Sequence, residues 1–264
     1  MSNRIDRMFE AKAAVGEKAL ITFVTAGDPT IAMTKRLVLE MEEAGADLIE
    51  LGVPYSDPIA EGPVIQAANV RALKNDVRLD TLFAMVEDLR RETQIPLVFL
   101  LYYNSVLQYG VERFFAACRC AGLDGAIIPD LPLEEADELA AAAKAQEVRF
   151  IRLVAPTSGE RIDAIAARAE GFLYCVSSLG VTGVRDSFQT NFEEYFAHVN
   201  RVKRTPSAIG FGISTPEQVR VLRSYADAVI VASAIIRRAA AVPEDEMPAV
   251  VSAFVRELRA ALVG

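Results

Sequence analysis

The sequence contains a single histidine, and this scarcity restricts the chemistry open to the chain. His198 lies in a polar–apolar pattern over residues 192–202 that predicts a surface helix, so we do not expect it to be catalytic. The cysteines Cys118, Cys120 and Cys175 form no disulfide framework, and no further His or Cys nearby completes a metal set. We interpret them as reduced and mostly buried. Proton transfer must therefore use Asp, Glu, Tyr or Lys side chains.

Lysine is absent from the positions where a Schiff-base aldolase would need it. None of the lysines stands at the C-terminal end of an apolar run; they are Lys12, Lys18, Lys35, Lys74, Lys144 and Lys203. No group of His, or of Asp with His, stands at those ends either, which disfavours a metal-dependent aldolase or epimerase. We therefore predict no metal site.

Basic clusters and long apolar runs are also missing. The chain has 36 Asp and Glu against 28 Lys and Arg, a net charge of −8, and no basic patch of the kind that binds nucleic acid. No stretch approaches the roughly 18 unbroken apolar residues of a membrane helix, and residues 1–7 lack an apolar signal core. We expect a cytoplasmic protein with neither a nucleic-acid nor a membrane partner.

Short apolar runs alternate with amphipathic segments along the chain, and 52% of its 264 residues are hydrophobic. The runs are Ala19–Thr25, Leu48–Leu51, Leu97–Leu101, Gly125–Ile128, Phe150–Val154, Phe172–Val176, Ala208–Gly210 and Ala228–Val231. Helical patterns cover Ile31–Ala44, Leu79–Thr93, Val111–Ala121, Glu134–Ala145, Glu160–Ala169, Phe192–Arg204, Pro216–Ser224 and Pro248–Leu262. Unbroken apolar strands are covered on both faces. The pattern predicts one α/β domain over residues 1–264, a (β/α)8 TIM barrel; an open doubly wound sheet with a smaller cap is the alternative.

Two glutamates fall where the active site of such a barrel lies, at the C-terminal ends of the strands. Glu50 interrupts the apolar run Leu48–Leu51, and no Lys or Arg follows closely to pair with it. A buried ion pair is the structural alternative; a pocket carboxyl with a pKa raised by desolvation is favoured. Glu61 follows in a Pro- and Gly-rich loop that could fold over the barrel mouth, or it could be an ordinary solvated acid.

A second group of candidate site residues follows the last three strands. Barrels often bind phosphate after strands seven and eight, through backbone N–H groups and a short helix N-terminus. Gly183, Phe211, Gly212 and Ser233 stand at these places, and Ser233 opens a helix-like stretch. Glycines alone also fit ordinary turns. Their position favours a phosphate site for a small phosphorylated substrate.

Several of these stretches together resemble one family. They are Phe23-Val-Thr-Ala-Gly-Asp-Pro29, Ile49-Glu-Leu-Gly-Val-Pro-Tyr-Ser-Asp-Pro-Ile-Ala-Glu-Gly-Pro63, Gly180-Val-Thr-Gly183 and Gly210-Phe-Gly-Ile213. End to end, the sequence is similar to the α subunits of tryptophan synthase. The resemblance implies retro-aldol cleavage of indole-3-glycerol phosphate to indole and glyceraldehyde 3-phosphate, in an α-β-β-α heterotetramer. It implies no cofactor on this chain, with pyridoxal phosphate only in the β subunit.

The resemblance also assigns roles to single residues. Glu50 matches the family's acid–base glutamate, Glu61 stands where better-known members have an aspartate that contacts the indole N–H, and Tyr174 matches a tyrosine beside them. The residues implied to face the indole ring are Phe23, Leu100, Leu153 and Ile230, and those implied to hold the phosphate are Gly183, Phe211, Gly212 and Ser233. Positions matching the β-subunit interface are Pro54, Asp57, Pro58, Asn104 and Asp130.

Two departures and one loop complete these expectations. Glu61 is one methylene longer than aspartate, and Ala232 stands where many members carry glycine. The loop over residues 178–191 is long and glycine-containing, which predicts a lid. Three other functions stay open: a stand-alone indole-3-glycerol phosphate lyase, a non-catalytic phosphate-binding barrel that activates a partner, and another phosphate-binding barrel isomerase.

Overall fold

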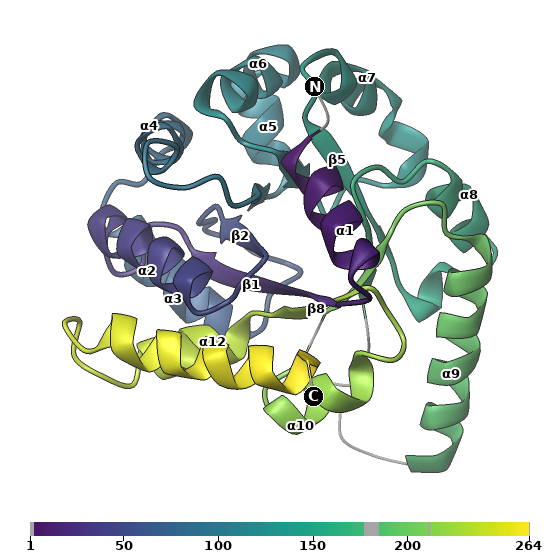
Figure 1. Cartoon of the computed structure of the whole chain (residues 1–264). Helices are drawn as coiled ribbons and strands as arrows, with labels where there is room; N and C mark the ends of the chain where they lie inside the picture. Colours follow the sequence, from purple (N-terminus) through teal and green to yellow (C-terminus); the bar gives the residue numbers. More distant parts are fainter. Residues whose placement is uncertain (1–2, 177–184, 211, 264) are drawn as a thin grey trace.

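The computed structural model describes residues 3–176, 185–210 and 212–263. Within these residues eight parallel strands pair in chain order, and the last pairs with the first to close a barrel (Figure 1). The strands are β1 (Ala19–Thr25), β2 (Leu48–Gly52), β3 (Leu97–Leu100), β4 (Gly125–Ile127), β5 (Arg149–Val154), β6 (Leu173–Val176), β7 (Ser207–Gly210) and β8 (Ala228–Val231). The predicted (β/α)8 barrel is confirmed, and the open-sheet alternative is wrong.

Helices surround the barrel and differ in part from the sequence expectation. They are α1 (Arg4–Ala14), α2 (Ile31–Glu43), α3 (Pro63–Leu73), α4 (Leu79–Leu89), α5 (Tyr103–Tyr109), α6 (Val111–Ala121), α7 (Asp137–Ala145), α8 (Arg161–Ala167), α9 (Arg185–Val202), α10 (Pro216–Leu222), α11 (Ser233–Ala239) and α12 (Met247–Val263). Short 3-10 turns, η1 (Leu133–Glu135) and η2 (Pro156–Ser158), follow β4 and β5. The sequence patterns missed α1, α3 and α5.

Helix α9 also begins earlier than predicted. It starts at Arg185 rather than at Phe192, so residues 185–191 are helical and are not part of a loop. No Gly or Pro between 185 and 191 interrupts the helix. The rest of the predicted lid, residues 178–184, lies outside the described residues.

The barrel interior and the helix layer form separate apolar clusters because successive side chains of a strand point to opposite faces. Ile21 of β1 and Ile151 of β5 pack inside the barrel, whereas Leu20 and Phe150 pack outside against the helices. All of β1 is buried. This burial on both faces explains why the strands have unbroken apolar sequences.

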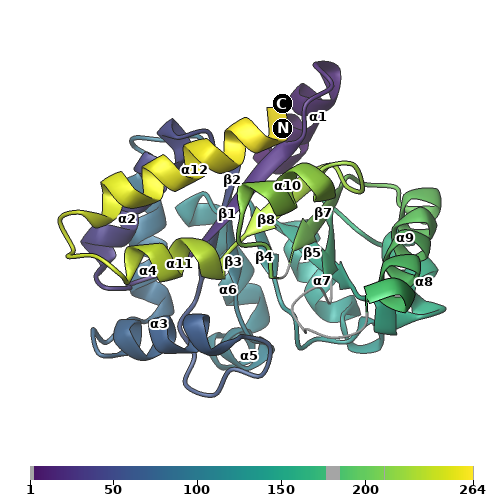
Figure 2. The ribbon, with the colours of Figure 1, turned by 90° about the horizontal axis from the view of Figure 1, so that it is seen from below.

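Helix α1 closes the N-terminal end of the barrel. Ile5 and Phe9 enter the interior cluster, and the rings of Phe9 and Phe172 lie 5.8 Å apart. Figure 2 shows α1 and both chain ends at one end of the barrel and helices α3 and α5 at the other. Asp124, 3% exposed, accepts hydrogen bonds from Arg4 and Arg90 at this closed end. The opposite end, formed by the C-terminal ends of the strands, is therefore the open one.

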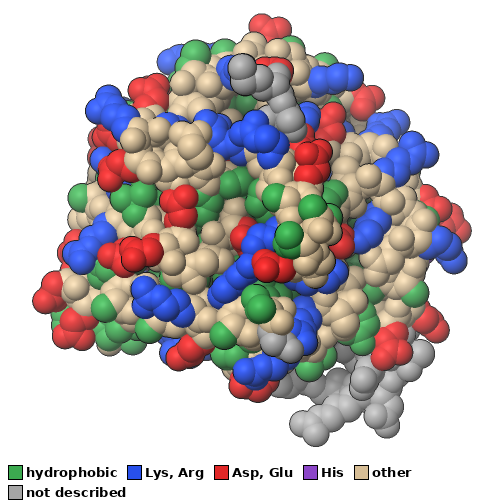
Figure 3. Space-filling model, viewed as in Figure 1, with side chains coloured by type: hydrophobic (Ala, Val, Ile, Leu, Met, Phe, Trp, Pro, Cys, Tyr) green, Lys and Arg blue, Asp and Glu red, His purple; other side chains and the backbone are tan. Residues whose placement is uncertain are grey.

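One cysteine differs from the sequence interpretation in its exposure to solvent. Cys118 and Cys175 are buried as expected, but Cys120 is exposed, because it lies on the solvent side of α6. His198 is on α9 and contacts Asp163. Figure 3 shows basic and acidic side chains interspersed on the face that carries α1.

No helix within residues 3–176, 185–210 and 212–263 combines the length and apolarity that crossing a membrane requires.

Candidate active site

A cavity of about 640 Å³ opens at the C-terminal ends of the strands. Apolar side chains dominate its wall, and two carboxyl groups, those of Glu50 and Glu61, interrupt it. The residues predicted from the sequence that line the cavity are Phe23, Glu50, Glu61, Leu100, Leu153, Tyr174, Gly212, Ile230 and Ser233. Side chains from six strands and from the segments after them thus meet around one space. Gly183 and Phe211 lie outside the described residues.

Glu50 is the least solvated of these carboxyl groups. It lies in β2, in register with Phe23 of β1 and Val98 of β3, and is 1% exposed. No described residue forms a hydrogen bond with its buried Oε1 atom. Burial raises the pKa of Glu50 from 4.5 to about 8, because a desolvated carboxylate loses its hydration. At neutral pH this carboxyl therefore holds a proton.

Two glycines at strand ends make room for aromatic side chains beside Glu50. A Cβ on Gly52 would lie 2.3 Å from Cζ of Phe23, and a Cβ on Gly210 would lie 2.7 Å from the hydroxyl of Tyr174. Any larger residue at either position would displace the ring. Burial and the neighbouring Glu50 charge raise the pKa of Tyr174 well above its ordinary value. Tyr174 is thus a neutral phenol on the cavity wall.

Glu61 reaches the cavity from the loop between β2 and α3. Tyr102 fixes this loop, because its hydroxyl accepts a 2.8 Å hydrogen bond from the N–H of Ala60. Gln66 of α3 donates to the carbonyl of Glu61 at 2.8 Å. Burial raises the pKa of Glu61, and the Tyr102 hydroxyl opposes that rise. The two carboxyl groups therefore have different surroundings, which suits them to different roles in acid–base chemistry.

Helix α3, which follows this loop, is itself held by the segment after β1. Pro63 takes its first position, where a missing N–H costs nothing. Arg71 forms two hydrogen bonds to Asp28, at 2.8 and 2.6 Å, and Asn75 donates to the carbonyl of Gly27. The segment that carries Glu61 is thus anchored at both of its ends.

The corner after β7 and β8 carries small residues and one cation. Gly212 has a φ of +75°, a conformation that favours glycine. Ser233 begins α11, and Ala232 is the residue that caps its N-terminus. Arg237, one turn further along α11, also lines the cavity. The sequence analysis named no Lys or Arg for this corner, so Arg237 is an addition to it.

The predicted interface positions lie around the rim of the open end. Asp57, Asn104 and Asp130 are exposed, Pro58 is partly exposed, and Pro54 is buried. Asn104 donates to the Tyr55 hydroxyl at 3.2 Å, which joins α5 to the loop after β2. Asp130 accepts from the N–H of Tyr103 at 2.9 Å, so it also satisfies the first turn of α5.

Sequence reasoning missed several residues of the cavity wall. They are Ala60, Gly62, Pro63, Val64, Ile65, Pro129, Val154, Ala155, Ser158, Val176, Ile213 and Arg237. Val64 and Ile65 belong to α3, which the patterns did not predict. Arg237 could have been found by its spacing of one helical turn from Ser233. Among the described residues, no group of three or more His, Cys, Asp or Glu side chains could hold a metal ion.

The fold and the cavity together define the class of protein. A (β/α)8 barrel with two differently placed carboxyl groups on an apolar wall at its strand ends is an enzyme scaffold for acid–base catalysis.

Comparisons with known proteins identify the family. A family model of the tryptophan synthase alpha chain matches residues 9–262. The tryptophan synthase alpha chain of Thermoanaerobacter sp. (strain X514) is 48% identical over 261 residues, which cover 98% of this chain and 100% of that protein. That of Caldanaerobacter subterraneus subsp. tengcongensis is 50% identical over 261 residues, with the same coverage of both chains. The structure of tryptophan synthase subunit alpha from Legionella pneumophila str. Paris is 34% identical, with a TM-score of 0.92 over 100% of this chain and 99% of that one.

The chain belongs to the tryptophan synthase alpha chain family. It is a carbon–carbon lyase of tryptophan biosynthesis, and the family predicted from the sequence motifs is confirmed.

The burial of Glu50 predicts a pH-dependent stability. Its pKa is raised in the folded chain from 4.5 to about 8, so its contribution to stability is fully present below pH 4.5 and is lost as the pH rises towards 8. Glu50→Gln removes this dependence. Between pH 5 and 8 the variant should gain stability relative to the wild type by up to about 1.4 kcal/mol per pH unit.

Urea denaturation of both proteins at pH 5, 6, 7 and 8 measures this difference. Glu10→Gln, at an exposed position of α1, controls for the removal of a surface charge. A stability difference between Glu50→Gln and the wild type that stays constant over this range would contradict a desolvated Glu50.

Proposed function

We propose that this chain cleaves indole-3-glycerol phosphate to indole and glyceraldehyde 3-phosphate, with Glu50 and Glu61 as its acid–base pair. One observation carries the proposal: a carboxyl group with a pKa of about 8 stands on the wall of an apolar cavity at the strand ends. Such a group is protonated at neutral pH, as a general acid must be before it acts. The apolar wall suits the indole ring.

In the proposed reaction, Glu50 first donates its proton to C3 of the indole ring. The ring nitrogen then carries the positive charge, and the Glu61 carboxylate accepts a hydrogen bond from its N–H. The Glu50 carboxylate next removes the proton from the hydroxyl on the carbon attached to C3. The bond from that carbon to C3 breaks, the hydroxyl becomes the aldehyde of glyceraldehyde 3-phosphate, and the bond electrons neutralise the ring nitrogen. Glu50 ends the cycle protonated, as it began.

The remaining lining residues suit substrate positioning. Phe23, Leu100, Leu153 and Ile230 contribute apolar surface for the ring. Tyr174 faces the same space as a neutral phenol, which lets its hydroxyl hydrogen-bond the substrate or Glu50 without a charge of its own. We assign the phosphate to the corner of Gly212, Ser233 and Arg237, with Gly183 and Phe211 as further candidates from the family motif. No step of this reaction requires a cofactor on this chain; pyridoxal phosphate would belong to the β subunit.

The central test is Glu50→Gln. An amide can form hydrogen bonds but cannot exchange a proton with C3, so indole formation should fall by about 100-fold or more. The purified chain is incubated with indole-3-glycerol phosphate, and indole is measured over time. Circular dichroism and urea denaturation verify that the variant is folded. A folded variant with near-normal turnover would refute the role.

Two substitutions at Glu61 distinguish the effect of its charge on kcat from the effect of its side-chain length. Glu61→Ala removes the group that stabilises the charged ring nitrogen and should lower kcat by about 100-fold. Glu61→Asp keeps the charge and should lower kcat far less, provided the loop held by Tyr102 moves to compensate for the shorter side chain. Steady-state kinetics of the two variants measure both effects. If Glu61→Ala is harmless, another residue contacts the indole N–H.

Arg237 offers a test of the phosphate corner. Arg237→Gln should raise KM by roughly 10- to 150-fold with little change in kcat, since a charge-assisted hydrogen bond contributes roughly 1.5–3 kcal/mol. Arg238→Gln is the matched control, because Arg238 does not line the cavity. Its guanidinium stacks on Phe254, with Cζ 3.8 Å from the ring centroid. Equal KM values for the two variants would place the phosphate elsewhere.

We also propose that the rim of the open end docks a β subunit, in an α-β-β-α heterotetramer. The predicted contacts Asp57, Pro58, Asn104 and Asp130 are at least partly exposed there, whereas Pro54 is buried and could contribute only after a rearrangement. Ile59 lies among them and is 81% exposed, an apolar side chain that a partner would cover. The solved Mycobacterium tuberculosis tryptophan synthase, whose matched chain is 33% identical with a TM-score of 0.89, is consistent with this proposal.

Mixing the chain with a β subunit from the same organism tests the docking. A complex should appear on size-exclusion chromatography, and the indole-forming rate should rise. Ile59→Asp should weaken the complex, whereas Val15→Asp, at an exposed apolar position (69% exposed) beside α1 at the closed end, should not. No complex and no rise in rate would favour the stand-alone lyase. Indole formation by the wild-type chain, with or without a β subunit, would exclude the non-catalytic barrel.

A further inference from the structure

Tyr102 connects the end of β3 to the loop that carries Glu61. It is the residue before α5, and it is 2% exposed. Its ring lies 4.8 Å from the ring of Tyr55, and its hydroxyl accepts a 2.8 Å hydrogen bond from the N–H of Ala60. Tyr55 and Ala60 both belong to this loop, and Ala60 directly precedes Glu61. One buried side chain thus contacts the loop at two points.

The loop depends on such contacts because it has no regular structure of its own. Residues 53–62 form neither a helix nor a strand, and Asp57, Ile59 and Ala60 are exposed to solvent. Exposed irregular segments sample several conformations unless a rigid element holds them. Tyr102 lies just beyond β3 and is not among the described residues that line the cavity. Any effect of Tyr102 on the reaction therefore passes through the loop and Glu61.

The Tyr102 hydroxyl also influences the charge of Glu61. A phenol can accept one hydrogen bond and donate another. The N–H of Ala60 occupies a lone pair of the oxygen, so the phenol proton stays available to the Glu61 carboxylate. Burial raises the pKa of Tyr102 to about 12, and the Glu61 charge adds to this rise, so Tyr102 keeps its proton at neutral pH. The hydroxyl in turn opposes the rise in the pKa of Glu61 that burial causes.

Other ionisable groups face the same cavity. They are Glu50 of β2, Tyr174 of β6 and Arg237 of α11. Glu50 and Tyr174 carry no charge at neutral pH, because burial raises the pKa of each. Arg237 stands in the corner that we assign to the phosphate. Burial and the Tyr102 hydroxyl are the influences that shift the pKa of Glu61.

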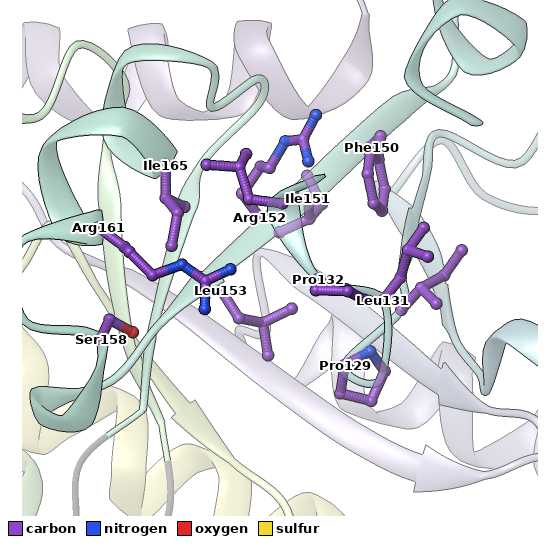
Figure 4. A pocket seen from close by; sticks show the side chains of 12 residues that line it. Pro129, Leu131, Pro132, Phe150, Ile151, Arg152, Leu153, Ser158, Arg161 and Ile165 are labelled. Carbon is purple, nitrogen blue, oxygen red and sulfur yellow. The ribbon is translucent and has the colours of Figure 1, made fainter. Parts of the chain in front are cut away.

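The β4–β5 side of the cavity brings no further charge to Glu61 within the described residues. Figure 4 shows this side, where a smaller pocket of about 180 Å³ shares Pro129, Leu153 and Ser158 with the main cavity. The arginines of the smaller pocket, Arg152 and Arg161, do not line the main cavity. Arg152 stacks on Phe150, and Arg161 pairs with Glu134.

One donor thus distinguishes the two glutamates. The Oε1 atom of Glu50 has no hydrogen-bond partner among the described residues, whereas Glu61 lies beside the Tyr102 hydroxyl. We propose that Tyr102 is a positioning residue that holds Glu61 at the cavity wall and keeps it ionised, so that Glu50 serves as the acid and Glu61 as the partner of the charged ring nitrogen. Tyr102 acts on the reaction proposed above only through Glu61, so its role depends on that reaction.

Tyr102→Phe tests this role, because it keeps the ring that lies against Tyr55 and removes only the hydroxyl. At pH 7 kcat should fall about tenfold with little change in KM, since Glu61 stabilises a charge that forms only during the reaction. In the pH profile of kcat/KM, the acidic limb, where Glu61 is protonated, should move up by about one pH unit. The alkaline limb near pH 8, which Glu50 sets, should stay. The profile of the variant is therefore narrower.

Tyr109→Phe is the matched control on α5. It removes a hydroxyl that donates to Asp80 at 2.6 Å and that does not line the cavity, so kcat and both limbs should stay unchanged. Circular dichroism and urea denaturation verify that each variant is folded. When Glu61→Ala is already present, Tyr102→Phe should lower kcat no further. Additive losses would show that Tyr102 acts on the reaction by another route and would overturn the proposal.

Direct titration of Glu61 separates the role of Tyr102 from the proposed function. In protein labelled with ¹³C at the carboxyl carbon of glutamate, the Glu61 resonance is the one that Glu61→Ala removes. Its pKa should be about one unit higher in Tyr102→Phe than in the wild type. An unchanged pKa would overturn the role of Tyr102, even where Glu61→Ala abolishes indole formation. A raised pKa together with a harmless Glu61→Ala would support the contact with Tyr102 and refute the reaction proposed for Glu61.

Discussion

The pairing of β1 with β8 is the contact on which the site depends. Ala19 pairs with Ala228 and Thr22 with Val231, and this register closes the sheet. Closure places the C-terminal ends of all eight strands around one opening. Glu50 of β2, Tyr174 of β6 and Ile230 of β8, far apart in the chain, then face one cavity. An open sheet would spread the same residues along an edge.

The buried carboxyl groups at the two ends of the barrel differ in their hydrogen bonding. Asp124 at the closed end accepts hydrogen bonds from Arg4, Arg90 and the N–H of Leu97, so its charge is satisfied. Glu50 at the open end has an unpartnered oxygen and a pKa of about 8. A satisfied carboxylate stabilises the fold, whereas an unsatisfied one is ready to exchange a proton.

The strands and Glu50 were predictable because each leaves a local signal. Unbroken apolar runs identify strands buried on both faces, and one carboxyl within such a run stands out. Helices α3 and α5 left weaker signals: α5 has 7 residues, and α3 follows a Pro- and Gly-rich loop. The fit of Phe23 over Gly52 depends on a contact between distant segments. No local pattern in one sequence records such contacts. Similarly, Cys120 was expected inside, but its exposure follows from which side of α6 meets the barrel.

The same contacts hold Glu61 and the rim at which we propose a partner docks. Tyr102 binds the N–H of Ala60 beside Glu61, and its ring lies 4.8 Å from that of Tyr55. Tyr55 in turn accepts a hydrogen bond from Asn104, a rim residue. A partner that shifts the rim would therefore move Tyr55 and Tyr102 with it, and through them the carboxyl of Glu61. Since Tyr102 opposes the rise in the pKa of Glu61, such a shift would change both the position and the protonation of that group. Docking and catalysis are then linked by a short chain of direct contacts, without any change in the barrel.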